Sequence, residues 1–223
     1  MYKFIFSIWI ACTVMACDIV PIAGYSRLPN DADMLAFTNV IERVVPVGEK
    51  WCRREARVSN CDFDILIAPE AGRYANAFQK QNEKGQPEII FTPGMITLQR
   101  NADELAFVLA HEMAHHILDH LGRVNVLIDT KEDKYEQLAG QDGIPLDKQV
   151  ARSVGAILAL NSYSKDFELE ADVLGARILQ AAGYDPLIGA QFFNRIPDPK
   201  NEFLTSHPPN SERYMTVYKA IGP

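Results

Sequence analysis

His111-Glu112-Met113-Ala114-His115 is the most informative stretch of this chain, because a helix through it brings two imidazoles and a carboxylate together. At about 100° per residue, His115 lies about 40° around an α-helix from His111 and one turn along it, with Glu112 beside the pair. Two neutral imidazoles in this arrangement can bind one zinc ion, and the glutamate can reach a water molecule in an open coordination position. The pKa of a water bound in this way is about 7, so Glu112 is predicted to be its general base.

The residues before this pentapeptide predict where its helix begins. Asn101 followed by Glu104 has the form of an N-cap with a capping box, and apolar residues at helical spacing follow. Gly122 is a typical helix stop, so we expect one helix of about 20 residues through the motif. The alternative is a helix whose histidines only pack against neighbouring side chains.

Three acidic residues in the second half of the chain offer the third protein ligand that a zinc site needs. Ser164 as a cap and Gly183 as a stop bound a second predicted helix, on which Glu168 and Asp172 share a face. We expect Glu168 to bind the metal and Asp172 to orient a ligand histidine through its other ring nitrogen. Glu170 competes as a ligand but points about 200° away from Glu168, and an acidic, solvated helix face is the other alternative.

Together these motifs resemble those of a known family. His111-Glu112-x-x-His115, Glu168-x-x-Ala171-Asp172 and His207-Pro208 with Arg213 are similar to the gluzincin metallopeptidases that include the HtpX heat-shock protease, the CAAX prenyl protease and BepA-like periplasmic proteases. The resemblance spans about residues 30 to 220 and shows no sign of tetratricopeptide repeats. It implies peptide-bond hydrolysis with one zinc ion, held by the two motif histidines and Glu168. The implied fold is α+β and mainly helical, a zincin-type domain with a small antiparallel or mixed sheet beside the motif helix.

The resemblance also suggests catalytic roles for His207 and Arg213. In similar enzymes this histidine and a nearby arginine lie by the active site, where they can stabilise the oxyanion or block the metal in a resting form. The alternative is a turn at His207 that leads into a final helix, with Arg213 in a structural salt bridge. His116 and His120 point about 140° and 180° away from His111, so we expect them to form capping or supporting hydrogen bonds rather than to bind the metal.

Three segments read as strands: Phe63–Ile67, Glu88–Thr92 and, between them, Asn76-Ala77-Phe78. The last segment resembles the NAF element of the family and is predicted to bind substrate. An exposed edge strand can hold an extended peptide by main-chain hydrogen bonds, which demand little of the peptide's side chains. The alternative is a set of core strands that never touch substrate.

A helix and a disulfide are predicted near the start of the domain. Apolar residues at helical spacing follow Asp31, and we expect this helix to stop at Pro46. Cys52 and Cys61 form an even pair and predict a disulfide in an oxidising compartment, with free buried thiols as the alternative. Closing a loop of about ten residues would stabilise the fold by roughly 2–3 kcal/mol.

The amino terminus predicts export. Residues 4–16 form an apolar run too short to span a bilayer comfortably, and Val14-Met15-Ala16-Cys17 resembles a bacterial lipobox. We therefore expect a signal peptide at 1–16, lipid on Cys17, a tether over 17–30 and one metallopeptidase domain over 31–223. Ordinary cleavage near Ala23 or an uncleaved anchor remain alternatives. The predicted location is the bacterial periplasm, with the lipoprotein anchored to the inner or the outer membrane.

Charge narrows the choice of partner. A net charge of −7 and a pI near 5.3 argue against a nucleic-acid partner and against a basic membrane-binding face. The polar stretch from Asp129 to Asp147, followed by a helical pattern over 150–160, is a candidate lid. We expect an endopeptidase that degrades misfolded or stalled envelope proteins. The rival is a non-proteolytic chaperone or assembly factor for outer-membrane proteins, although a pure binder has no need of Glu112.

Overall fold

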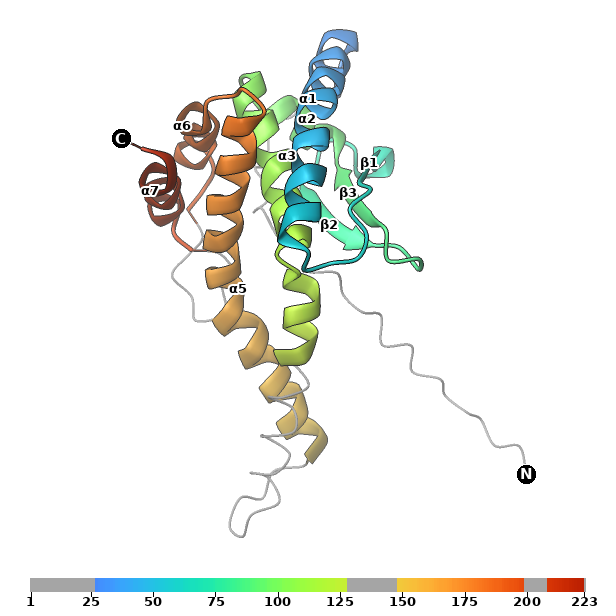
Figure 1. Cartoon of the computed structure of the whole chain (residues 1–223), viewed down its shortest axis with the longest axis vertical. Helices are drawn as coiled ribbons and strands as arrows, with labels where there is room; N and C mark the ends of the chain where they lie inside the picture. The colour runs from blue at the N-terminus through green and yellow to red at the C-terminus, as the bar shows by residue number, and fades with distance from the viewer. Residues whose placement is uncertain (1–26, 128–147, 199–207, 223) are drawn as a thin grey trace, which may run out of the picture.

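The computed structural model describes residues 27–127, 148–198 and 208–222, and two helices form its centre. Helices α3 (Ala102–Ile117) and α5 (Lys148–Ala181) lie side by side, with the sheet beyond α3 (Figure 1). Helices α6 (Pro186–Gly189) and α7 (Asn210–Ile221) lie on the opposite side of α5. Helix α1 (Asp31–Glu55) packs on α3. The predicted class, mainly helical α+β with a small sheet beside the motif helix, is confirmed.

Helix α1 is longer than its sequence predicts. Asn30 caps it, since the Asn30 side chain accepts a hydrogen bond from the backbone of Asp33. The predicted stop at Pro46 is wrong, because the helix continues through this proline to Glu55. Residues on both sides of Pro46, among them Val44 and Cys52, are buried on one face, so the packing of that face outweighs the lost backbone hydrogen bond.

The sheet is mixed and has three strands in the order β1-β3-β2. The central strand β3 (Pro87–Phe91) pairs in parallel with β1 (Asp64–Ile67) and antiparallel with β2 (Ala77–Gln81). All three predicted strands are present, although the segment predicted at Asn76 begins one residue later and runs further. Strand β2 lies at an edge of the described sheet and packs beside α3.

Helix α3 begins where the capping signals predict. Asn101 accepts a hydrogen bond from the backbone of Glu104, and the Glu104 carboxylate accepts one from the backbone of Arg100. The predicted end near Gly122 is wrong, because α3 stops at Ile117 and the chain is helical again over 120–127. At the break, Asp119 has a φ of +54°, a left-handed conformation that ends the first helical run.

Helix α5 is one continuous element of 34 residues, so the cap predicted at Ser164 is absent and the helix runs through it. Its end before Gly183 agrees with prediction, since this glycine has a φ of +84°. A Cβ added at Gly175 would lie 3.0 Å from the backbone nitrogen of His111. The absence of a side chain there lets α5 approach α3 closely at the motif.

The remaining elements are short: η1 (Pro69–Ala71), α2 (Pro93–Leu98), α6 (Pro186–Gly189), η2 (Ala190–Asn194) and α7 (Asn210–Ile221). The predicted disulfide is present, and Cys52 at the end of α1 is bonded to Cys61 before β1. Within the described ranges, no helix is both long and apolar enough to cross a membrane.

Several predictions fall on residues that the structure does not describe. These are the signal peptide, lipid attachment at Cys17, most of the tether, the polar stretch from Asp129 to Asp147, and His207. They stay predictions from the sequence.

Candidate metal centre

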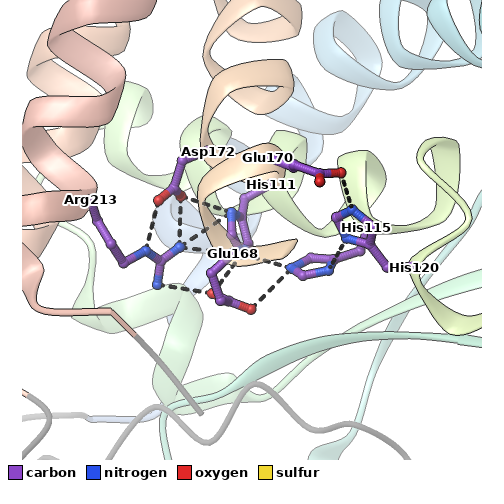
Figure 2. Close-up of polar contacts among 7 residues, drawn as sticks. All are labelled: His111, His115, His120, Glu168, Glu170, Asp172 and Arg213. Carbon is purple, nitrogen blue, oxygen red and sulfur yellow. Dashed lines mark hydrogen bonds and ion pairs between the residues drawn. The ribbon is translucent and has the colours of Figure 1, made fainter. Parts of the chain in front are cut away.

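Two helices bring the three predicted metal ligands together. Helix α3 supplies His111 and His115, and α5 supplies Glu168, whose carboxylate faces both rings (Figure 2). The Nε2 atoms of the two histidines lie 3.0 Å apart. The Glu168 oxygens lie 3.4 Å from Nε2 of His111 and 3.3 Å from Nε2 of His115.

This arrangement fits a tetrahedral metal ion. Zinc binds nitrogen and carboxylate oxygen at about 2.0–2.2 Å, so two tetrahedral ligand atoms lie about 3.3 Å apart. The three separations, 3.0, 3.3 and 3.4 Å, are close to that value. His111 and Glu168 are buried, whereas the His115 side chain is 15% exposed. The set of two imidazoles and one carboxylate is a donor set typical of catalytic zinc.

Asp172 and Arg213 lie directly behind these residues. Asp172 is fully buried, and its Oδ1 lies 3.0 Å from Nδ1 of His111. Arg213 comes from α7 and donates to both carboxylate oxygens of Asp172, at 2.7 and 2.8 Å, while its Nη1 lies 3.2 Å from Glu168 (Figure 2). The structure thus places Asp172 at the ring nitrogen of His111 that faces away from the metal position. Arg213 bridges the two carboxylates, and its predicted role at the oxyanion stays a prediction.

The charges of this buried cluster perturb its protonation. Burial raises the pKa of Glu112 to about 8, and the neighbouring Glu168 carboxylate also raises it. Burial and Arg213 both oppose protonation of His111, but hydrogen bonds to Asp172 and Glu168 outweigh them and raise its pKa to about 9. In the metal-free protein the centre therefore holds protons at neutral pH that a metal ion must displace.

Glu112 faces the sheet and is not one of the three converging groups. It is only 3% exposed, and its carboxylate accepts a hydrogen bond from the backbone N–H of Gln79 in β2. The backbones of Asn76 and Asn82 bond to the neighbouring strand, at Thr92 and Gln86. Because antiparallel pairing alternates, the odd-numbered residues of β2 direct their backbone groups to the free edge. That edge therefore runs past Glu112.

Of the predicted substrate-binding residues, Asn76 directly before β2 and Ala77 at its start are buried, whereas Phe78 is partly exposed. The Asn76 backbone nitrogen donates to the Thr92 hydroxyl, so this residue helps to join β2 to the sheet. Of the three, Ala77 is the one whose backbone points to the free edge.

The other two histidines of the cluster do not join the three ligands, as predicted. His116 Nε2 lies 2.7 Å from the carbonyl oxygen of Asn60, which ties α3 to the loop before β1. His120 Nδ1 lies 2.9 Å from Nδ1 of His115, and its Nε2 lies 3.3 Å from Glu170. Glu170 points away from the three ligands, as predicted. Its contact with His120 was not predicted, since it depends on the helix break after Ile117.

Comparisons with known proteins agree with the motifs. A model of the family described as peptidase family M48 matches residues 42–220. The mitochondrial metalloendopeptidase OMA1 of Arabidopsis thaliana is 24% identical over 139 residues, which cover 59% of this chain and 27% of that protein. The beta-barrel assembly-enhancing protease of Yersinia pestis is 30% identical over 127 residues, which cover 48% of this chain and 25% of that protein. The chain thus spans about a quarter of the length of each of these relatives.

A solved structure is also similar. The crystal structure of S. mikatae Ste24p matches with a TM-score of 0.41 and 17% identity, over 70% of this chain and 44% of that one. The family match covers most of this chain and includes all the described residues of the centre. The resemblance and the enzyme class predicted from the motifs, a metallopeptidase, are thereby confirmed at the level of the family. The chain belongs to peptidase family M48.

Proposed function

We propose that this protein is a zinc-dependent endopeptidase that hydrolyses misfolded or stalled envelope proteins. The observation that carries the proposal is the convergence of His111, His115 and Glu168 beside a buried glutamate that faces a strand edge. A chaperone or assembly factor could use the same fold, but it would not need a general base at that position.

The chemistry assigns a role to each residue of the centre. His111, His115 and Glu168 would hold zinc, which when bound acts as a Lewis acid and lowers the pKa of water to about 7. Glu112 takes the proton of the attacking water and passes it to the leaving amine. His207 and Arg213 are the candidates to stabilise the developing oxyanion, and one such donor typically contributes about 2.7–4 kcal/mol.

The free edge of β2 is the proposed substrate-binding element. An extended peptide can pair with it through main-chain hydrogen bonds, and this pairing brings a peptide bond close to Glu112. Recognition of this kind depends on the backbone of the substrate rather than on its side chains, so it is suited to unfolded proteins of any sequence. It also leaves both ends of the peptide free to extend, which favours an endopeptidase.

Sequence features outside the centre support an envelope location. The apolar run over 4–16 and the Val14-Met15-Ala16-Cys17 motif favour a lipoprotein anchored to the inner or outer membrane. The disulfide between Cys52 and Cys61 suits an oxidising compartment such as the periplasm. The similar Yersinia pestis protein is named a beta-barrel assembly-enhancing protease, which favours substrates in the same compartment.

Zinc removal tests the activity. The purified full-length protein should cleave a chemically unfolded outer-membrane protein, lose this activity on treatment with a chelator, and regain it when zinc is restored. The His207→Ala variant is assayed in parallel, because a resting form blocked by His207 would hide the activity. If both proteins bind zinc and neither cleaves the substrate, the non-proteolytic alternative replaces the proposal.

Replacement of the lipobox cysteine tests the anchor. Cys17→Ser should block signal processing or release the protein from the membrane fraction, since several acyl chains give stable anchoring and their loss removes it. Fractionation followed by immunoblotting measures this change. Cys12→Ser is the matched control, because it alters a cysteine within the predicted signal peptide. Unchanged membrane partitioning of Cys17→Ser would rule out lipid attachment at this residue.

A further inference from the structure

A second group of polar side chains lies against His115 on the side away from the three converging ligand atoms. His120 Nδ1 lies 2.9 Å from His115 Nδ1, and His120 Nε2 lies 3.3 Å from Oε2 of Glu170 (Figure 2). Glu170 in turn accepts two hydrogen bonds from Arg123, at 2.6 and 3.1 Å. A chain of contacts thus runs from Arg123 through Glu170 and His120 to His115.

The donors and acceptors of this chain have one consistent assignment. A carboxylate paired with an arginine accepts only, so His120 donates from Nε2 to Glu170. The Nδ1 of a neutral His120 is then an acceptor, and His115 must donate to it from Nδ1. In that tautomer the lone pair of His115 lies on Nε2, which faces Glu168 at 3.3 Å. The opposite tautomer would present an N–H to the metal position.

We propose that His120 and Glu170 are positioning residues for His115, holding it in the tautomer and orientation that expose Nε2 to the metal. The inference deepens the proposed function, because it presumes a metal ion at this centre. It gives His115 the same kind of support that Asp172 gives to His111. The two ligand histidines are therefore supported from opposite sides, His111 by Asp172 of α5 and His115 by His120, which Glu170 of α5 holds in turn.

The break in the helix after Ile117 is what makes this contact possible. In an unbroken helix His120 would lie about 140° around the axis from His115, and the two rings could not meet. The left-handed Asp119 redirects the chain, and the His120 ring then stacks on Phe167 with centroids 4.4 Å apart and an interplanar angle of 9°. The ring orientation is thus fixed by Phe167 as well as by Glu170.

Two substitutions separate positioning from packing. His120→Phe keeps an aromatic ring on Phe167 but removes the acceptor for His115. His120→Asn loses the ring but keeps an oxygen at the place of Nδ1. If His120 positions His115, His120→Phe should lower zinc affinity by about 10–100-fold, which is the range measured when a group that supports a ligand is lost. His120→Asn should lower zinc affinity by less than about tenfold.

The measurement is zinc affinity by competition with a chelator on the full-length protein, together with the thermal midpoint of the metal-free form. Glu170→Gln should weaken zinc binding less than His120→Phe does, because the amide oxygen of glutamine can still accept a hydrogen bond from His120. Glu49→Gln is the control, since Glu49 forms an exposed ion pair with Arg53 on α1.

A spectroscopic readout reports the tautomer directly. In metal-free protein labelled with ¹⁵N-histidine, the His115 ring should show protonated Nδ1 in the wild type and lose this preference in His120→Phe. If wild type binds zinc and His120→Phe binds it equally well with an unchanged tautomer, the positioning role is wrong while the metal site stands. If the wild type binds no zinc, both the proposed function and this inference are wrong.

Discussion

Glu112→Gln should abolish peptide cleavage and leave zinc bound. Glu112 is not among the three groups that converge on the metal position, so its loss removes the general base without removing a ligand. General bases contribute about 10²–10⁴-fold to rate, and a loss of that size in kcat is expected. The amide oxygen can still accept the hydrogen bond from Gln79, which keeps the local structure. Cleavage rate and bound zinc are measured on the same sample.

A matched substitution tests whether the loss of any carboxylate near the sheet would lower the cleavage rate. Glu88→Gln alters a carboxylate of β3 that pairs with Lys80, and it should keep full activity. Glu168→Gln should lose both zinc and cleavage, because it removes a proposed ligand. Cleavage by Glu112→Gln at close to the wild-type rate would exclude Glu112 as the base.

The same substitution should change how the stability of the metal-free protein depends on pH. Burial raises the pKa of Glu112 from 4.5 to about 8, so between these values the folded state binds a proton that the unfolded state does not. The contribution of Glu112 to stability is therefore greatest below its unfolded pKa and falls as pH rises through this window. The buried His115, His116 and His120, whose pKa values are lowered from 6.5, make an opposite contribution below that value. His111, raised from 6.5 to about 9, adds a second fall at higher pH. Relative to the wild type, Glu112→Gln should therefore gain stability as pH rises from 4.5 to about 8, and it should keep the fall caused by His111.

The parts of the centre that sequence alone could predict are those governed by local periodicity. His111 and His115 are four residues apart on one helix, as are Glu168 and Asp172 on another, so each pair had to share a face once its helix formed. The cap at Asn101 is equally local, since the bond to Glu104 spans three residues. These features need only a helix, and both helices formed.

Helix ends were harder to predict because packing decides them. Pro46 normally ends a helix, yet α1 continues because apolar residues on both sides of it face the core. Ser164 and Gly122 carry ordinary local signals, but α5 runs through the first and the break in α3 comes before the second. A cap is worth about 1 kcal/mol and a proline inside a helix costs about 3 kcal/mol, and the burial of a few apolar side chains can outweigh either.

A supporting role for His120 was predicted, but its partners were not, for the same reason. His120 meets His115 only after the chain turns at Asp119, and Glu170 reaches His120 only once α5 lies against α3. That approach depends on Gly175, where a side chain would meet the backbone of His111. The contact between His120 and Glu170 joins residues fifty positions apart, beyond the reach of a periodic pattern.

Arg213→Gln should strongly destabilise the metal-free protein. Arg213 is buried and donates to both oxygens of Asp172 while lying 3.2 Å from Glu168, so its loss leaves these two buried carboxylates to share the protonated His111. Breaking a buried ion pair by removing one partner costs about 3–5 kcal/mol. Denaturant unfolding of chelator-treated protein measures the loss. Added zinc should recover part of it, because the metal supplies positive charge to the same carboxylates.

A double-mutant cycle decides whether the ion pair itself is responsible. Asp172→Asn alone should also destabilise, since it removes the acceptor of Arg213 and the partner of His111. If the two side chains act as a pair, the double variant loses less free energy of unfolding than the two single variants lose together. The difference, the coupling energy, should be about 0.5–3 kcal/mol. Strict additivity would mean that Arg213 stabilises the fold through other contacts, such as its stacking on Phe193 at 4.2 Å. In that case the ion pair could not be what holds α7 against the metal centre.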